Sequence, residues 1–373
     1  MRSLVGVFAL GAAWVGLATP TISGLKVSTI SPLGLAIDYT VSGAVARDTN
    51  RAIKVSMAVG GVTNVAKAIA GETNCVNGAH RVYWNTAEDG ISIDQAKSKV
   101  SVEYGEVKLP LYLVIDLSGG SNATSYAVTY MNAPPSGGFN TTVYKTKKLV
   151  LRWCPAGADP LGRYTLTKDF YAGLFEVTQK QWSQVTGGSK NTYHGTGDTY
   201  PIHYLTYNDV RGSSAGAKWP SSSAVDSTSF IGKLRAKTKL VELDLPTEAQ
   251  WEYACRAGTT TTYNVGDTEN ALAGAAWYSG NANKMTHTVG QKMANGWGLY
   301  DMHGNVWEWC LDGNGGSLTG SDPVGGTSYF YRRVRGGSWS DDASSATSSY
   351  RNYGEARSDN AGNFGFRVFM TVP

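Results

Sequence analysis

A single short segment divides the chain into two parts and limits the folds open to it. Residues 132–140 read Asn-Ala-Pro-Pro-Ser-Gly-Gly-Phe-Asn, and the prolines and glycines of this run disfavour both helix and strand. The chain has 373 residues, which is enough for two hydrophobic cores, because a single core rarely grows beyond ~250–300 residues. We therefore predict two domains joined by a linker at residues 134–146.

Residues 21–133, before this linker, alternate apolar and polar side chains. Alternation with a period of two buries one face of a β-strand. The pattern recurs in four runs, at residues 35–41, 53–59, 100–104 and 109–113, and no convincing helical stretch interrupts them. We predict that residues 21–133 form an antiparallel β-sandwich of the immunoglobulin or fibronectin kind.

The first 18 residues have the features of a secretory signal peptide. Arg2 supplies a positive start, residues 4–17 form an apolar stretch, and Gly-Leu-Ala at residues 16–18 offers a cleavage site. An uncleaved membrane anchor is the alternative, although the stretch is shorter than the ~20 residues that span a bilayer. No other segment is apolar enough to span. We expect a secreted, periplasmic or cell-surface protein with no stable membrane span after cleavage.

Charge and cysteine content narrow the possible partners. The formal net charge is +4, and no block of Lys and Arg could follow a phosphate backbone, so nucleic acid is not expected as a partner. The chain has four cysteines, at Cys75, Cys154, Cys255 and Cys310, without the Cys-x-x-Cys spacing of zinc and redox sites. An exported protein can form disulfides, but the spacing does not define which cysteines pair.

Helix signals appear only after residue 147. Thr178 and Gln181 have the spacing of a capping box, and Gly187 is a suitable residue to end the helix that follows. Residues 247–250, Thr-Glu-Ala-Gln, repeat the device after a proline, and Gly258 ends the second helix. We predict two short helices within long stretches rich in Gly, Ser, Asn and Tyr.

Several blocks in the same part of the chain resemble those of a known family. They lie at residues 170–179, 245–258, 295–309, 335–339 and 365–367. In order and number they are similar to the signature blocks of the formylglycine-generating-enzyme family, also called sulfatase-modifying factors. The resemblance covers residues 147–373 and implies an irregular, C-type-lectin-like α+β domain. The fold class expected for the chain is therefore α+β, with this domain preceded by the all-β sandwich.

One of these blocks contains a carboxylate in an apolar setting. In an extended segment Trp307 and Trp309 fall on one face, and Glu308 points the other way, where a buried carboxylate needs a partner. The resemblance implies a Ca²⁺ ion held by oxygen atoms of Asp301, Gly304, Val306 and Glu308, a donor set that suits this ion. The alternative is a buried ion pair between Glu308 and Arg335 or Arg367.

The oxidase of this family uses oxygen and copper to convert a substrate cysteine to formylglycine. It holds Cu(I) between two thiolates that lie just after the Gly-Gly-Ser-aromatic block, and thiolates are the soft ligands that this ion prefers. In this chain Asp341 stands about where the first cysteine would fall, and no cysteine follows Cys310. Copper is therefore not expected, and no catalytic residue is assigned. The formylglycine-generating oxidase remains the alternative function.

The segment between the last two blocks, residues 338–364, interleaves aromatic, charged and amide side chains with small residues. This mixture is typical of recognition loops. In some relatives of this fold the segment faces the ligand, and in relatives diversified by retroelements it is the part that varies. The predicted ligand-binding residues are Trp339, Asp341, Asp342, Tyr350, Arg351, Tyr353, Glu355, Arg357, Asp359, Asn360 and Asn363. A solvated loop without a ligand is the alternative.

Together these features predict an exported, non-catalytic protein for recognition or structure. A β-sandwich would precede a calcium-stabilised domain that binds a protein or a glycan. The competing hypothesis is an oxidase that makes formylglycine in a sulfatase.

Overall fold

A computed structural model describes most of the chain and divides it into two compact units, Met1–Lys108 and Leu109–Val372. The described residues are 21–31, 34–42, 53–59, 62–65, 69–71, 78–85, 98–104, 110–190, 193–326, 330–352, 355–356 and 362–372. The predicted signal peptide at residues 1–18 and Cys75 lie outside them. No helix among the described residues is long and apolar enough to cross a membrane.

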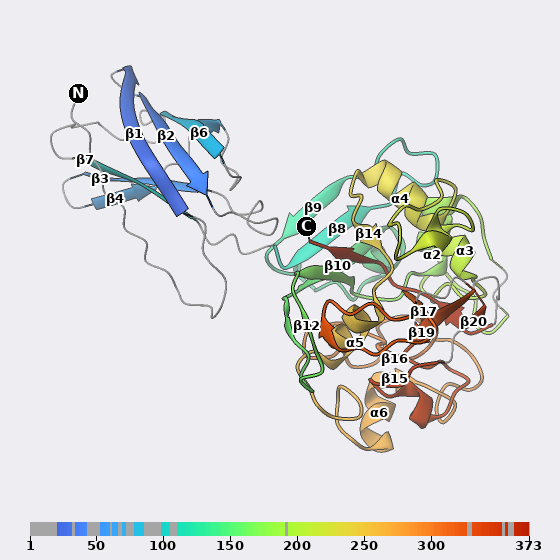
Figure 1. Ribbon diagram of the computed structural model, residues 1–373. Coiled ribbons are helices and arrows are strands. Elements are labelled where there is room, and N and C mark those ends of the chain that lie inside the picture. The colour runs from blue at the N-terminus through green and yellow to red at the C-terminus, as the bar shows by residue number, and fades with distance from the viewer. Residues whose placement is uncertain are drawn as a thin grey trace. The chain divides into compact units, whose positions relative to one another are not determined.

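The N-terminal unit contains two antiparallel sheets (Figure 1). One has the order β1 (Thr21–Ser31), β2 (Gly34–Ser42), β6 (Gly78–Asn85), β5 (Ile69–Gly71), and the other β4 (Val62–Val65), β3 (Ile53–Val59), β7 (Ser98–Tyr104). On β2 the alternate residues Ile37, Tyr39 and Val41 are buried, as their spacing predicted. The prediction of an all-β N-terminal domain is confirmed over the described residues of this unit.

The predicted boundary between the domains is wrong. The apolar run at residues 109–113 leads into β8 (Tyr112–Asp116), which belongs to the C-terminal unit and pairs with β10 (Lys148–Cys154). β9 (Val128–Met131) pairs with β8 in the same sheet. Alternation marks a half-buried strand but does not identify the sheet that the strand joins.

The predicted linker is also part of this unit. It contains helix α1 (Thr142–Thr146), and Phe139 is buried with its ring centroid 4.7 Å from that of Tyr112 and 4.9 Å from that of Tyr144. The prolines and glycines at residues 134–138 therefore form a turn within a domain, whereas the units divide between Lys108 and Leu109.

Two sheets organise the C-terminal unit. The larger has the order β14 (Leu243–Asp244), β22 (Phe369–Thr371), β13 (Phe170–Gly173), β10, β8, β9. The smaller has the order β20 (Glu355–Ala356), β19 (Tyr331–Arg335), β17 (Trp307–Gly313), β21 (Phe364–Gly365). A short three-stranded sheet has the order β11 (Gly157–Ala158), β12 (Tyr164–Leu166), β18 (Gly320–Ser321). In addition, β15 (Ala276–Trp277) pairs with β16 (His303–Gly304).

The two predicted helices are confirmed. Helix α2 (Gln179–Thr186) begins with a complete capping box between Thr178 and Gln181 and ends at Gly187 with φ 80°. Helix α5 (Glu248–Arg256) begins with the same device at Thr247. These boundaries were predictable because each cap satisfies free backbone N–H groups with side chains three residues apart in the sequence.

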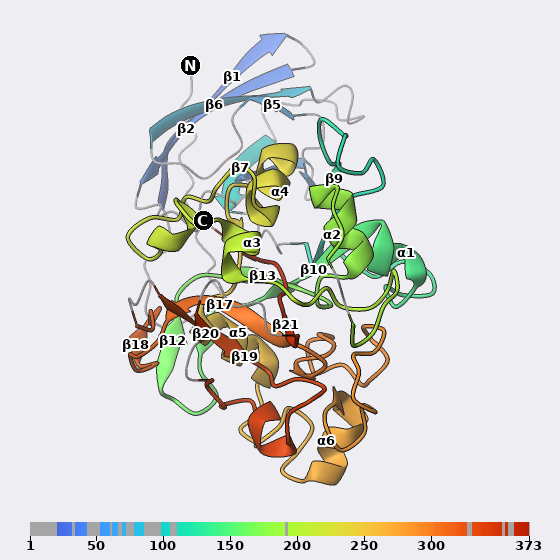
Figure 2. The ribbon, with the colours of Figure 1, turned by 90° about the vertical axis from the view of Figure 1, so that its right-hand side faces the viewer.

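The remaining helical segments are short. They are α3 (Tyr207–Arg211), α4 (Phe230–Thr238), α6 (Glu269–Ala275) and the 3₁₀ turns η2 (Gly216–Lys218) and η3 (Ala343–Ala346). Figures 1 and 2 show α2, α3 and α4 together at one end of the unit and α6 at the other. Every residue of α5 and of β17 is buried, so these two elements form the centre from which the candidate site is built.

Candidate ligand-binding site

The predicted recognition segment begins where β19 ends, at Gly336 and Gly337. These glycines have φ of 98° and 77°, values that other residues rarely adopt. A Cβ atom on Gly337 would lie 3.0 Å from the Cα of Ala346, and one on Gly336 would lie 3.2 Å from the Trp251 ring. The chain can therefore turn directly against the core only with glycine at both positions.

Asp341 and Asn363 tie the two ends of the segment together. The Asp341 carboxylate accepts a hydrogen bond from Trp307 Nε1 at 2.9 Å and another from the hydroxyl of Ser338. Asn363 Nδ2 donates to the hydroxyls of Ser338, at 3.1 Å, and Ser340, at 3.2 Å. The structure thus brings these two predicted ligand residues close together, but much of their bonding capacity is used within the protein.

The predicted aromatic anchors lie mostly inside. Trp339 is 9% exposed and stacks on His194 with ring centroids 4.5 Å apart. Tyr350 is partly buried against the core, 5.9 Å from the Trp307 ring. Sequence spacing alone does not show which way these rings point, and in the structure they contribute to packing.

Buried charges beneath the segment hold its shape. Arg351 makes a bidentate ion pair with Glu248 of α5, with distances of 2.7 and 2.6 Å. Arg335 pairs with Glu252 at 2.6 Å and donates to the backbone carbonyls of Ser348 at 2.9 Å and Tyr350 at 2.8 Å. Arg351, predicted to contact ligand, is thus an anchor of the loop.

The side chains of five further predicted ligand-binding residues are not described by the structure. Glu355 lies in the short strand β20 opposite Arg332, and its side chain is not described. Tyr353, Arg357, Asp359 and Asn360 lie outside the described residues.

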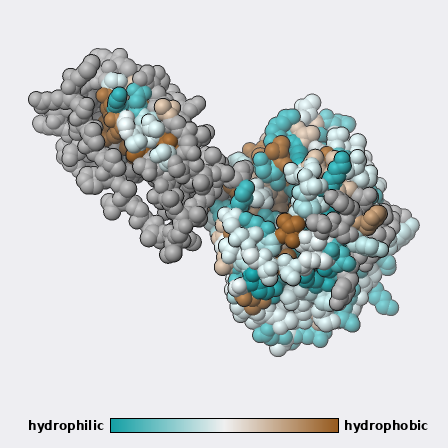
Figure 3. Space-filling model, in the orientation of Figure 1, coloured by the Kyte–Doolittle hydropathy of each residue, from teal (hydrophilic) through white to brown (hydrophobic). Residues whose placement is uncertain are grey.

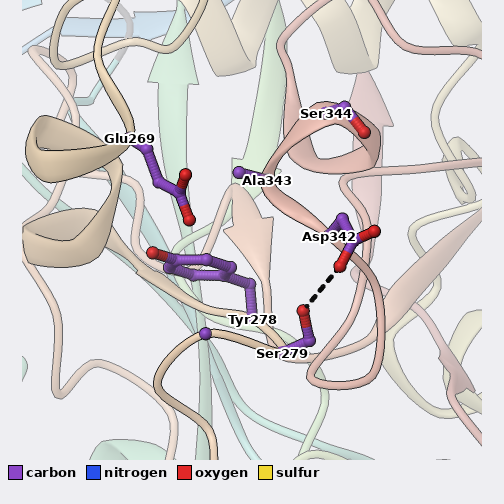
Figure 4. Close-up of a pocket in the computed structure, with 7 residues that line it drawn as sticks. Glu269, Tyr278, Ser279, Asp342, Ala343 and Ser344 are labelled. Atoms are coloured by element: carbon purple, nitrogen blue, oxygen red, sulfur yellow. Dashed lines mark hydrogen bonds between the residues drawn. The ribbon is translucent and has the colours of Figure 1, made fainter.

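A pocket opens beside this segment, with a volume of about 400 Å³ (Figure 4). Its lining includes Glu269, Tyr278, Ser279, Gly280, Asp342 and Ser344. Asp342 alone among these residues was predicted from the sequence. Ser344 lies in η3 within the predicted segment, and the remaining residues come from the start of α6 and the turn after β15, for which no sequence motif pointed to a ligand.

Local contacts fix the wall of the pocket. The Ser279 hydroxyl donates to Asp342 Oδ1 at 3.0 Å, and the Ser279 N–H donates to the Asp341 carbonyl at 3.0 Å. Burial raises the pKa of the Tyr278 phenol, and the neighbouring Glu269 raises it further. Tyr278 is therefore protonated at neutral pH, and it lines the pocket together with the two carboxylates.

The predicted calcium ligand Glu308 forms a buried ion pair with an arginine, which was the alternative to a calcium site. Arg367 Nε contacts both carboxylate oxygens at 2.8 Å, and Arg367 Nη2 contacts Oε1 at 2.6 Å. Trp251 Nε1 donates to Oε2 at 2.7 Å. Three N–H donors thus contact a carboxylate that has about four lone-pair sites, so most of its bonding capacity is used within the protein. The partner is Arg367, since Arg335 pairs with Glu248 and Glu252.

The other predicted calcium ligands do not replace it. Asp301 accepts from the Gly290 N–H at 2.6 Å through Oδ2, whereas its buried Oδ1 has no partner. Burial raises the pKa of Asp301 to about 6. No group of three or more acidic, His or Cys side chains suited to a metal occurs among the described residues. Of the two predicted side-chain ligands, Asp301 thus offers one unpartnered oxygen, and calcium stays a prediction for titration to test.

The described thiols are poorly placed for copper. Cys154, Cys255 and Cys310 are buried and unpaired, and burial raises the pKa of all three, that of Cys255 to about 12. The Cys255 sulfur lies 3.7 Å from the Met302 carbonyl oxygen, and that of Cys310 lies 3.8 Å from the Glu308 carbonyl oxygen. These groups remain neutral thiols at physiological pH, whereas Cu(I) binding by sulfur favours thiolates.

Comparison with known proteins identifies the C-terminal unit. Chaperone protein LppX of Paenibacillus barcinonensis is 28% identical over 214 residues, which cover 49% of this chain and 73% of LppX. The formylglycine-generating enzyme of Mycobacterium tuberculosis is 49% identical over 76 residues, but these cover only 17% of this chain and 25% of that enzyme.

A solved structure supports the same fold. Treponema denticola variable protein 1 matches with a TM-score of 0.51 and 24% identity, over 61% of this chain and 96% of that chain. The family model of the sulfatase-modifying factor enzyme 1-like domain matches residues 131–372, which confirms the resemblance and the C-type-lectin-like α+β fold. The chain belongs to the sulfatase-modifying factor enzyme 1-like family.

Proposed function

We propose that this protein is an exported, non-catalytic recognition protein that binds a protein partner through the surface around residues 338–352. The observation that carries this proposal is the hydrogen bonding of the Asp341 carboxylate. The carboxylate accepts hydrogen bonds from Trp307 and Ser338. By the family resemblance, Asp341 stands at about the position where the oxidase would need a copper-binding sulfur. A hard oxygen donor cannot replace a thiolate for Cu(I).

The shape of the site supports binding. A polar pocket of about 400 Å³ lies next to a loop that buried ion pairs hold in one conformation. A preorganised surface loses less conformational entropy on binding than a mobile one. Among the coloured residues of the C-terminal unit in Figure 3, hydrophobic residues form small separate patches, so polar contacts would provide most of the specificity on this face.

A protein is favoured over a glycan as the partner. The similarity to LppX covers 73% of a protein described as a chaperone, and chaperones act on other proteins. Recognition of another exported protein is thus the simplest function to transfer, and the signal-peptide features at residues 1–18 agree with export.

The formylglycine-generating oxidase is the second candidate, because 49% identity links part of the chain to such an enzyme. Incubation of the purified protein with a Cys-x-Pro-x-Arg peptide, copper and oxygen separates the two functions. We expect no aldehyde above a copper-only control, measured by mass spectrometry with an aldehyde-reactive probe. Aldehyde formation that needs the folded protein would overturn the proposal.

Recognition itself can be tested with a random peptide display library and a glycan array. We expect enriched peptides whose binding is lost when Ser340 and Ser349, both exposed on the loop, are changed to Arg. Binding to glycans alone would change the partner class. Binding to neither, or binding that the loop variants leave intact, would refute recognition by this surface.

A further inference from the structure

The pocket beside the loop is an open hollow that carries charge which the protein does not neutralise. Its volume lies within the range of about 300–1,000 Å³ that is usual for ligand sites. Glu269 contributes one carboxylate from the start of α6, and Asp342 contributes another from the residue before η3. The two approach the pocket from elements more than 70 positions apart in the sequence.

Other acidic residues of this unit contrast with this pair. Glu248, Glu252, Glu308 and Asp244 all pair with arginine side chains. In the part of the chain that the structure describes, neither Glu269 nor Asp342 forms an ion pair. Their neighbours in the pocket are neutral: the Tyr278 phenol lies near Glu269, and the Ser279 hydroxyl donates to Asp342. A concave site lined by charge of one sign concentrates its field and attracts the opposite charge.

The wall between the carboxylates is aromatic. Tyr278 is 6% exposed and lines the pocket, and Gly280 lies directly against its ring. A Cβ atom on Gly280 would lie 2.6 Å from Tyr278 Cε2, so any larger residue would displace the ring. A planar cation can stack on an aromatic ring while its N–H groups reach carboxylates, which favours a guanidinium over a compact ammonium.

We propose that this pocket binds an arginine side chain of the partner, with Glu269 and Asp342 as the acceptors and Tyr278 as the stacking surface. The proposal rests on the recognition function proposed above and specifies its ligand chemistry. Asp342 Oδ1 already accepts from Ser279, so the guanidinium would bond its other oxygen.

The test uses the full chain and three capped amino acids: N-acetyl-arginine amide, N-acetyl-lysine amide and N-acetyl-citrulline amide. Citrulline has nearly the shape of arginine but no charge. We expect saturation-transfer NMR and calorimetry to show arginine binding at least tenfold tighter than citrulline and tighter than lysine, with affinity that falls as salt is added. Equal binding of arginine and citrulline would overturn the proposal.

Matched variants locate the site. Glu269→Gln/Asp342→Asn should weaken arginine binding at least tenfold, and Gly280→Ala should weaken it by moving the ring. Asp198→Asn/Glu242→Gln removes the same charge at residues that do not line the pocket and should have little effect. If both double variants weaken binding equally, the attraction is general and the pocket is not the site.

Failure of this proposal can be distinguished from failure of the proposed function. If the display library yields loop-dependent peptides but arginine amide does not bind, recognition stands and its ligand chemistry is different. If arginine amide binds in the pocket but no loop-dependent peptide is found, the pocket site stands without the wider recognition function.

Discussion

Replacement of Glu308 by Gln should destabilise the C-terminal unit strongly. Glu308 is 1% exposed and Arg367 is fully buried, and three contacts of 2.6–2.8 Å join their side chains. Removal of one partner from a buried pair leaves an uncompensated charge and costs about 3–5 kcal/mol. For a domain of roughly this size one kcal/mol shifts Tm by about 2–4 °C, so Tm should fall by about 6–20 °C.

A double-mutant cycle assigns this loss to the pair. Arg367 also donates to the carbonyls of Gly173, Tyr300 and Asp301, so Arg367→Met has costs beyond the lost ion pair. The coupling energy between Glu308→Gln and Arg367→Met separates the two effects. Urea unfolding followed by tryptophan fluorescence measures it, with Glu242→Gln as a surface control that should change stability by less than about 0.5 kcal/mol. Coupling of less than about 0.5 kcal/mol would mean that Arg367 is not the partner of Glu308, and the reasoning would fail.

Four further results are expected. Added Ca²⁺ should leave Tm unchanged, because Arg367 and Trp251 occupy the Glu308 oxygens; a saturable rise in Tm that Glu308→Gln abolishes would restore the calcium site. Glu248→Gln should increase hydrogen exchange of residues 348–351, since Arg351 and Arg335 lose a buried acceptor, and unchanged exchange would refute the anchoring role. Gly337→Ala should cost about 1–3 kcal/mol in urea unfolding, because φ is 77° and the new Cβ would meet Ala346, whereas exposed Gly188→Ala should cost little. Burial and the nearby Glu248 carboxylate raise the pKa of Asp312 to about 7 from 3.8, so the folded state binds its proton more tightly than the unfolded state. The free energy of unfolding should therefore fall as the pH rises from about 4 to 7, and Asp312→Asn should flatten that slope. An unaltered slope would contradict the assignment.

The sequence was most informative where structure is determined locally. The capping boxes at Thr178 and Thr247 use contacts three residues apart, so helices α2 and α5 could be placed from the sequence. The family blocks gave the fold of the C-terminal unit correctly. The strand predicted at residues 109–113 overlaps β8 only at Tyr112 and Leu113. Its partner β10 lies more than 30 residues later, and nothing local identifies that partner.

The candidate site was harder to predict because contacts distant in sequence define it. Glu308 had two possible arginine partners, and only the fold shows that Arg367, 59 residues away, is the one. Glu248 was visible only as a helix-start residue, although it anchors Arg351 across 103 positions. The pocket joins the start of α6, the turn after β15 and the start of η3, so no single stretch of sequence contains its pattern.

The position of the anchors below the 338–352 loop has a practical consequence. Glu248, Glu252 and Arg335 are buried, whereas Ser340, Asp342, Ser344 and Ser349 are exposed on the same loop. The residues that fix the backbone are thus separate from those that solvent reaches. Randomising the four exposed positions while the buried charges are kept should yield libraries of stable variants, which makes this domain a starting point for engineered binders.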